Sequence, residues 1–112
     1  MKPQSAKAKG RRLQQDIRDL ILGTFPELQP DDVRSTSMGA GGEDIQLSPA
    51  ARRFLPIQIE CKNKGKSAVH TMYNQAKEHG DYEPVLIVKQ NHDKALAVVD
   101  ASFFFGLLRQ GR

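Results

Sequence analysis

The sequence predicts an α/β or α+β domain in which helices flank a mixed β-sheet. Three stretches carry this prediction. Residues 11–24 place apolar side chains at the spacing of one helix face, and residues 55–62 alternate apolar and polar side chains as a half-buried strand does. Residues 85–89, "VLIVK", form a continuous apolar run that is typical of a strand buried on both faces.

The first half of the chain reads as one helix followed by three strands. Leu13, Ile17, Leu20 and Ile21 share one face of the helix over residues 11–24, and the prolines of "FPELQPDD" end it. The strands are expected in "DVRSTS", "EDIQL" and "LPIQIECK", with "SPAARR" as a turn before the last of them.

The second half is expected to contain a helix, two strands and a last helix. Ser67 caps a helix that runs to about His79, where a glycine ends it. Strands follow over residues 85–89 and 95–100, and Asp100 caps the helix "ASFFFGLLRQ". The apolar "FFFGLL" within this helix suits either deep burial or a dimer interface.

Length and composition fit one small globular domain. The 112 residues are 38% hydrophobic and 27% charged, within the ordinary globular range. No apolar run approaches the roughly 20 residues that span a bilayer, and the N-terminus lacks the apolar region of a secretory signal. Cys61 is the single cysteine, which excludes an intramolecular disulfide. We therefore expect an intracellular protein with no membrane partner.

Basic residues are concentrated at the N-terminus of a chain whose net charge is +4. Residues 1–10 are expected to form either a basic arm that suits a polyanion or a solvated tail, ahead of one domain over residues 11–112. Further basic residues follow the third strand. The residues that could line a path for phosphates are Arg11, Arg12, Arg52, Arg53, Lys64 and Lys66, and the alternative is that they form a solvated surface.

The third strand ends with a carboxylate and an ammonium on the same face. Side chains alternate along a strand, so Glu60 and Lys62 point away from its apolar residues. Asp44, which comes after the glycine-rich "MGAGG", would reach them from the preceding strand. Two carboxylates and the carbonyl of Cys61 would make an oxygen-rich Mg²⁺ site, and Lys62 would orient the attacking water. The alternative is a solvated Glu60–Lys62 ion pair.

This motif and the order of elements together resemble a known family. Asp44, then Glu60, Cys61 and Lys62, are similar in placement to the site of the PD-(D/E)XK nuclease superfamily. The resemblance covers residues 11–100. It implies a restriction-endonuclease-like core with the element order αβββαββα, in which Asp44, Glu60 and Lys62 are catalytic and the metal ligands are Asp44, Glu60 and the carbonyl of Cys61.

Within that superfamily the sequence is most similar to the small Holliday junction resolvases of archaeal type and their phage relatives. Arg34, Ser37 and Gly39 occupy the "R…S-x-G" stretch before the first acid. The resemblance implies a homodimer that cuts branched DNA during recombination, with Mg²⁺ as cofactor and Mn²⁺ as a substitute. It also implies Ser37 as a catalytic residue, Arg34 and Ser37 as DNA contacts, and Gln75 as a catalytic residue or a solvated helix residue.

Two departures from the family pattern leave alternatives open. Family members often carry a Glu on the first helix, where this sequence has Gln15 with Asp16 and Asp19 as neighbours. Glu43 competes with Asp44 as the first ligand; Asp44 is preferred because its apolar neighbours then lie on the opposite face. Two other functions therefore remain in view: a less selective DNA nuclease or nickase, and a DNA-binding protein that has lost catalysis.

Overall fold

The computed structural model describes residues 6–36 and 44–111, which form an α+β fold. The chain forms two compact units: unit 1 is Met1–Asn63 with Phe105–Arg112, and unit 2 is Lys64–Phe104. Mixed helix and strand content was predicted and is confirmed. The described strands pair as two antiparallel two-stranded sheets, one in each unit.

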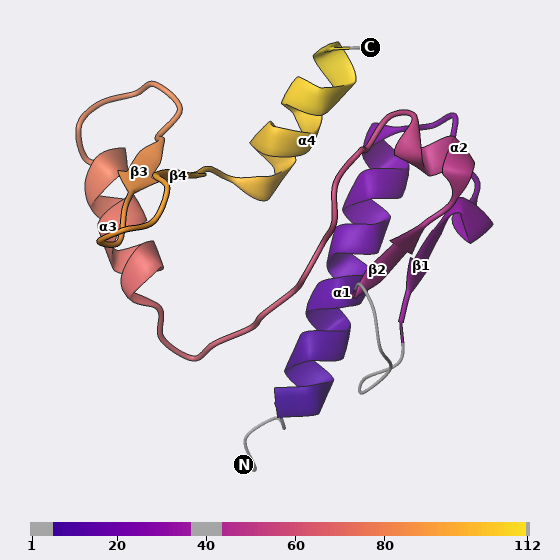
Figure 1. The fold of residues 1–112 in the computed structure, drawn as a ribbon, viewed down its shortest axis with the longest axis horizontal. Coiled ribbons are helices and arrows are strands. Elements are labelled where there is room, and N and C mark those ends of the chain that lie inside the picture. The colour runs from indigo at the N-terminus through magenta and orange to yellow at the C-terminus, as the bar shows by residue number, and fades with distance from the viewer. Residues whose placement is uncertain (1–5, 37–43, 112) are drawn as a thin grey trace. The chain divides into compact units, whose positions relative to one another are not determined.

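The elements follow the chain as labelled in Figure 1. Their bounds are α1 Ala6–Thr24, the 3-10 helix η1 Pro30–Asp32, β1 Val33–Ser35, β2 Ile45–Leu47, α2 Pro49–Arg52, α3 Ala68–Lys77, β3 Leu86–Val88, β4 Leu96–Val98 and α4 Ala101–Gln110. Across the two described stretches, no helix combines the length and the apolarity needed to cross a membrane.

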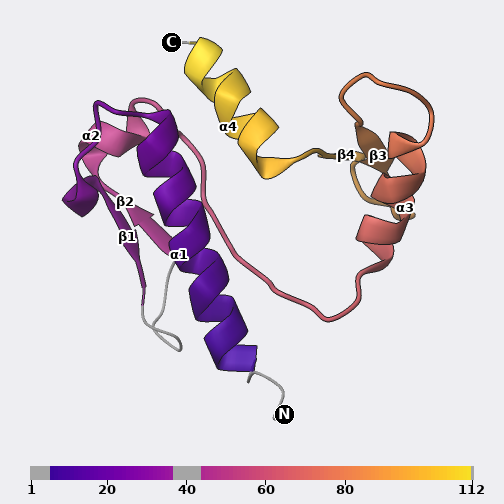
Figure 2. The same cartoon turned by 180° about the vertical axis from the view of Figure 1, so that it is seen from behind.

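Helix α1 begins earlier than the apolar pattern alone predicts. It starts at Ala6, so the second half of the expected basic arm is helical. Its apolar face packs on the β1–β2 hairpin, and Figure 2 shows the two side by side as Figure 1 does. Ile21 and, just past the helix, Phe25 are fully buried there. The single domain expected over residues 11–112 stays a prediction.

The β1–β2 hairpin turns one face toward α1. Val33 pairs with Leu47 and Ser35 pairs with Ile45, so these four side chains share a face. Val33 and Ile45 are fully buried, whereas Arg34, on the opposite face, is exposed. A short hairpin of this kind is marginal by itself and depends on the helix packed against it.

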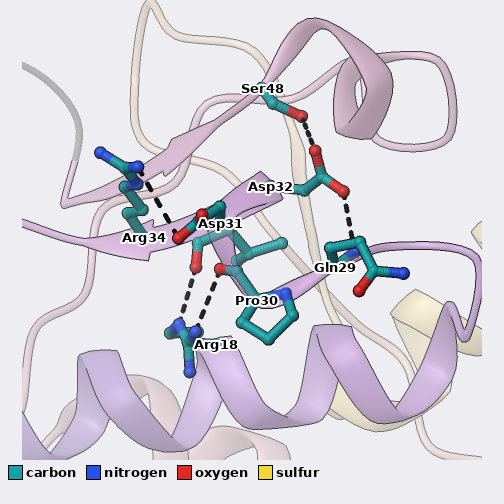
Figure 3. A network of polar contacts seen from close by, with 8 residues as sticks. Arg18, Gln29, Pro30, Asp31, Asp32, Arg34 and Ser48 are labelled. Atoms are coloured by element: carbon teal, nitrogen blue, oxygen red, sulfur yellow. Dashed lines mark hydrogen bonds and ion pairs between the residues drawn. The ribbon is translucent and has the colours of Figure 1, made fainter.

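Polar contacts fix the turn that leads into β1 (Figure 3). Arg18 of α1 donates through Nε to the carbonyl of Val33 at 2.7 Å. Asp32 accepts from the N–H of Gln29 at 2.8 Å and from the hydroxyl of Ser48 at 2.7 Å. The Ser48 hydroxyl and then the Gln29 N–H lower the pKa of Asp32, because both bonds favour the ionised carboxylate. The turn and the start of α2 are thereby tied together.

The third predicted strand, residues 55–62, does not form as a strand. Among the described residues, its pairing is an isolated antiparallel bridge between Ile59 and Ile45 of β2. The carbonyl of Ile57 is taken by the guanidinium of Arg52, and the N–H of Ile57 bonds two residues back. These local bonds occupy the N–H and the carbonyl of Ile57, which a longer pair of strands would need for its own hydrogen bonds. The proline before Ile57 has no N–H to donate. The pattern was right about Ile59 and wrong about the strand length.

Residues 105–110 of α4 belong to unit 1. Phe105 is buried, and the guanidinium of Arg109 lies 5.8 Å from the ring centre of Phe25. The same guanidinium donates to Glu27 at 2.6 Å, which lowers the pKa of that carboxylate. Leu107 is 48% exposed, so "FFFGLL" is buried on one side only. Its role as a dimer interface stays a prediction.

Unit 2 pairs β3 with β4 and packs α3 against β3. Its helix and strands were predicted at these places and are confirmed. None of its residues is buried, and Ile87, at the centre of the run expected to lie in a core, is 63% exposed. Unit 2 therefore has the secondary structure that the sequence predicts without a closed core of its own.

Candidate functional site

Asp44 lies immediately before β2, with its carboxylate turned to the segment around Cys61. The N–H of Cys61 donates to Oδ2 of Asp44 at 2.6 Å. The N–H of Asp44 donates to the carbonyl of Ile59 at 3.1 Å. These two bonds join Asp44 to the residues on both sides of Glu60. The proximity expected from the sequence is thus present, while the catalytic role of Asp44 stays a prediction.

Glu60 and Lys62 extend from this segment into solvent. The antiparallel register that pairs Ile45 with Ile59 brings Asp44 level with Glu60 when it is continued by one residue. The Nζ of Lys62 lies 3.6 Å from Oε1 of Glu60, with both side chains about 70% exposed (71% and 72%). An exposed ion pair contributes at most about 1 kcal/mol to stability. Little free energy is therefore lost when either side chain leaves the pair to bind a ligand.

The thiol of Cys61 reports that both carboxylates are near. Burial raises the pKa of Cys61 above its usual range, and the negative charges of Asp44 and then Glu60 raise it further. A carboxylate disfavours a second anion only when the two groups are close. Cys61 is bonded to Asp44 through its N–H and follows Glu60 directly in the chain, so both carboxylates belong to residues beside it.

The donors at this point fit a hard divalent cation. Mg²⁺ binds through one or two carboxylates and completes its shell with water and substrate phosphate. Asp44 and Glu60 supply that number, and Oδ1 of Asp44 makes no hydrogen bond within the described residues. No group of three or more His, Cys, Asp and Glu side chains suited to a metal occurs in residues 6–36 and 44–111. The site would thus hold a cation only together with water or phosphate.

Helix α1 buries a polar residue, which the sequence did not predict, against the β1–β2 hairpin. Gln14 is 3% exposed, and its Oε1 accepts a hydrogen bond from the hydroxyl of Ser35 at 2.7 Å. Gln15, Asp16 and Asp19, the positions considered from the sequence, are exposed. Gln14 could have been found, because it falls on the same helical face as the apolar residues three and seven positions later.

The other predicted residues are distributed over the chain. Ser37, Gly39 and Glu43 lie outside the described residues. Arg34 is exposed on β1, where it pairs with Asp31 at 3.7 Å. Arg34 also lines a surface pocket of unit 1. The residues that line this pocket are Gln15, Arg18, Asp19, Arg34 and Ser35.

The predicted DNA-contacting basic residues and Gln75 are divided between the two units. Arg11 and Arg12 are exposed on α1, in the unit that holds Asp44 and Glu60. Lys64, Lys66 and Gln75 are exposed in unit 2. All five are accessible to a ligand. A shared phosphate path through them stays a prediction, as does the catalytic role of Gln75.

Comparison with known proteins assigns no family or function to the site. No protein-family model, curated protein or solved structure matches this chain. The functional proposal therefore rests on the placement of Asp44, Glu60 and Lys62 beside Cys61.

Proposed function

We propose that this protein is a Mg²⁺-dependent DNA endonuclease of the PD-(D/E)XK type that acts on four-way or otherwise branched DNA. One observation carries the proposal. The carboxylate of Asp44, held at 2.6 Å by the N–H of Cys61, lies at the segment that presents Glu60 and Lys62. These are the residue types that phosphodiester hydrolysis needs: two hard oxygen donors and a nearby cation.

Each residue has a distinct task in this proposal. Asp44 and Glu60 would hold the metal ion, with the carbonyl of Cys61 as a further ligand. When bound, Mg²⁺ polarises the phosphate and acidifies a water molecule. Lys62, whose ammonium already lies beside Glu60, would move to the phosphate and stabilise the negative charge that grows on it.

Charge and topology support DNA as the substrate. The net charge of +4 and the exposed Arg11 and Arg12 on α1 favour contact with a phosphate backbone. In support of the proposal, α1, β1, β2, the bridge at Ile59 and α3 come in this order along the chain, with the short helix α2 between β2 and the bridge. The restriction-endonuclease-like core with the order αβββαββα is part of the proposal. The proposed enzyme is a homodimer, because a four-way junction is resolved by two cuts.

A second candidate function is a DNA-binding protein without catalysis. It is favoured by Gln15, which stands at the helix position where family members often carry a carboxylate. The side chain that α1 buries against the sheet, Gln14, is an amide as well. An amide does not supply the negative charge that a metal ligand needs. If Asp44 and Glu60 alone do not retain a cation, binding would persist and cleavage would be lost.

The test is cleavage of a labelled four-way junction, a duplex of matched sequence and a single strand, each with Mg²⁺ and with EDTA. Paired nicks in the junction alone, abolished by EDTA, are the expected result. Equal cutting of the duplex would instead identify a less selective nuclease or nickase. Tight junction binding with no cutting in Mg²⁺ or Mn²⁺ would identify the DNA-binding protein.

A further inference from the structure

Asp44 is the first described residue after residues 37–43, yet its main chain is held on both sides. Its carbonyl accepts two hydrogen bonds from Thr36, one from the N–H at 3.0 Å and one from the hydroxyl Oγ1 at 3.1 Å. Its N–H donates to Ile59. With Cys61 on the carboxylate, Asp44 is fixed at three of its polar groups.

The Thr36 hydroxyl is the part of this arrangement that the sheet does not supply. The N–H bond from Thr36 continues the β1–β2 ladder by one pair, as any residue there would do. The hydroxyl adds a second donor to the same carbonyl, which has two lone pairs to accept them. Threonine is β-branched and stiff at χ1, so it holds the hydroxyl in place.

Strand β1, which ends one residue before Thr36, is itself anchored. Ser35, one residue earlier, donates to the buried Gln14 of α1 at 2.7 Å. Thr36 is half-buried, so its bond to Asp44 is partly shielded from competing water. A continuous series of contacts thus runs from α1 through β1 to the main chain of Asp44.

We propose that Thr36 is a positioning residue, whose hydroxyl fixes the main chain of Asp44 so that its carboxylate is presented with Glu60 to a divalent cation. The inference rests on the proposed function for the role of the cation. The positioning of Asp44 by Thr36 is measurable without catalysis. Groups that orient a metal ligand typically change metal affinity or activity by about 10–100-fold when they are removed.

The experiment compares Thr36→Val, Thr36→Ser and a matched control, Thr24→Val. Valine keeps the shape of threonine and removes the hydroxyl, whereas serine keeps the hydroxyl. Thr24 makes the same kind of bond, from its hydroxyl to the carbonyl of Leu20 at 2.8 Å, at the end of α1. The control therefore removes an equivalent bond that does not touch Asp44.

Three measurements are taken on each protein. Amide hydrogen exchange at Asp44 and Cys61, without metal, reports whether the main chain and carboxylate of Asp44 are held. Mn²⁺ affinity by calorimetry, and the Mg²⁺ dependence of junction cleavage, report on the cation. We expect Thr36→Val to speed exchange at both amides and to weaken Mn²⁺ binding on the order of tenfold, with the KM for DNA unchanged. Thr36→Ser and Thr24→Val should resemble the wild type.

The outcomes separate this inference from the proposed function. Unchanged exchange at Asp44 and Cys61 in Thr36→Val would overturn the positioning role, whatever the enzyme does. Equal weakening of Mn²⁺ binding by Thr24→Val would also overturn it, because the effect would then be general loss of stability. Faster exchange in Thr36→Val, with neither Mn²⁺ binding nor cleavage in the wild type, would support the positioning of Asp44 and reject the proposed function.

Discussion

Unit 1 and unit 2 differ in how far their apolar side chains are buried. All eight buried hydrophobic residues among those described lie in unit 1, whereas five of the six large exposed ones lie in unit 2. The exposed ones in unit 2 are Val69, Tyr82, Val85, Ile87 and Leu96. The closed core of unit 1 is also what supports Asp44, Glu60 and Lys62. The candidate site therefore lies in the unit that has a closed core, which can support it.

The largest effect is expected at the site in unit 1. Glu60→Gln keeps the size of the side chain and removes the charge, so we expect junction cleavage to fall by about a hundredfold or more, beyond the loss caused by a supporting group. The measurement is the single-turnover cleavage rate at saturating protein. Gln75→Ala in unit 2 is the comparison, and a larger loss there than in Glu60→Gln would move the site to unit 2.

The contrast in packing predicts a difference in stability between two matched substitutions. Ile21→Ala empties a fully buried position in unit 1 and should cost about 2–5 kcal/mol of the free energy of unfolding. Ile87→Ala removes a side chain that is 63% exposed in unit 2 and should cost about 0.5 kcal/mol or less. Urea unfolding measures both. Equal losses would show that Ile87 is buried in solution and that unit 2 has a core.

A smaller effect is expected where Ser48 ties the start of α2 to Asp32. Ser48→Ala removes the N-cap bond to the N–H of Ala51 and should cost about 1 kcal/mol. It also removes the bond that lowers the pKa of Asp32. A lowered pKa gives stability that is present above the usual value of 3.8 and is lost as the pH falls through the folded-state value.

Thermal unfolding of the wild type and Ser48→Ala between pH 7 and pH 2 measures this pH dependence. The difference between the two proteins should be largest near neutral pH and should narrow in acid. A difference that does not change with pH would mean that Ser48 acts as a helix cap alone.

The smallest effect is a change in thiol reactivity that reports on the geometry of the site. The pKa of Cys61 is raised by burial and then by Asp44 and Glu60. Neutralising either carboxylate, in Asp44→Asn or Glu60→Gln, should lower that pKa and increase the thiolate fraction. Alkylation by iodoacetamide at a fixed pH near 8 should therefore be faster by a few-fold in both variants. Acceleration in neither variant would contradict the closeness of the two carboxylates to Cys61.

The parts of the fold that depend on local sequence were predicted well. Helices α1, α3 and α4 show their apolar spacing directly, and β3 and β4 lie within the runs expected for them. The third strand was overestimated because its length depends on nonlocal pairing, and Arg52 and Ile57 make competing bonds nearby. A period of two in the sequence shows which side chains share a face and does not show how much of the ladder forms.

The roles of the candidate site residues stay predictions, and the residues that support them were not predicted. Asp44, Glu60 and Lys62 were chosen from chemistry and spacing, and the structure brings their segments together. Gln14 and Thr36 were missed because their importance lies in their partners, Ser35 and the carbonyl of Asp44. A polar residue in an apolar helical stripe is a usable signal for Gln14, whereas nothing local in the sequence distinguishes Thr36 from any other threonine.

In the proposed function, Asp44 and Glu60 of unit 1 together bind a divalent cation. Calorimetric titration of Mn²⁺ into the wild-type protein, Asp44→Asn and Glu60→Gln tests it most directly, because it needs neither DNA nor turnover. We expect one site in the wild type that is lost or severely weakened in both variants. Equal Mn²⁺ affinity in all three proteins would show that the cation is held elsewhere and that the proposed site is wrong.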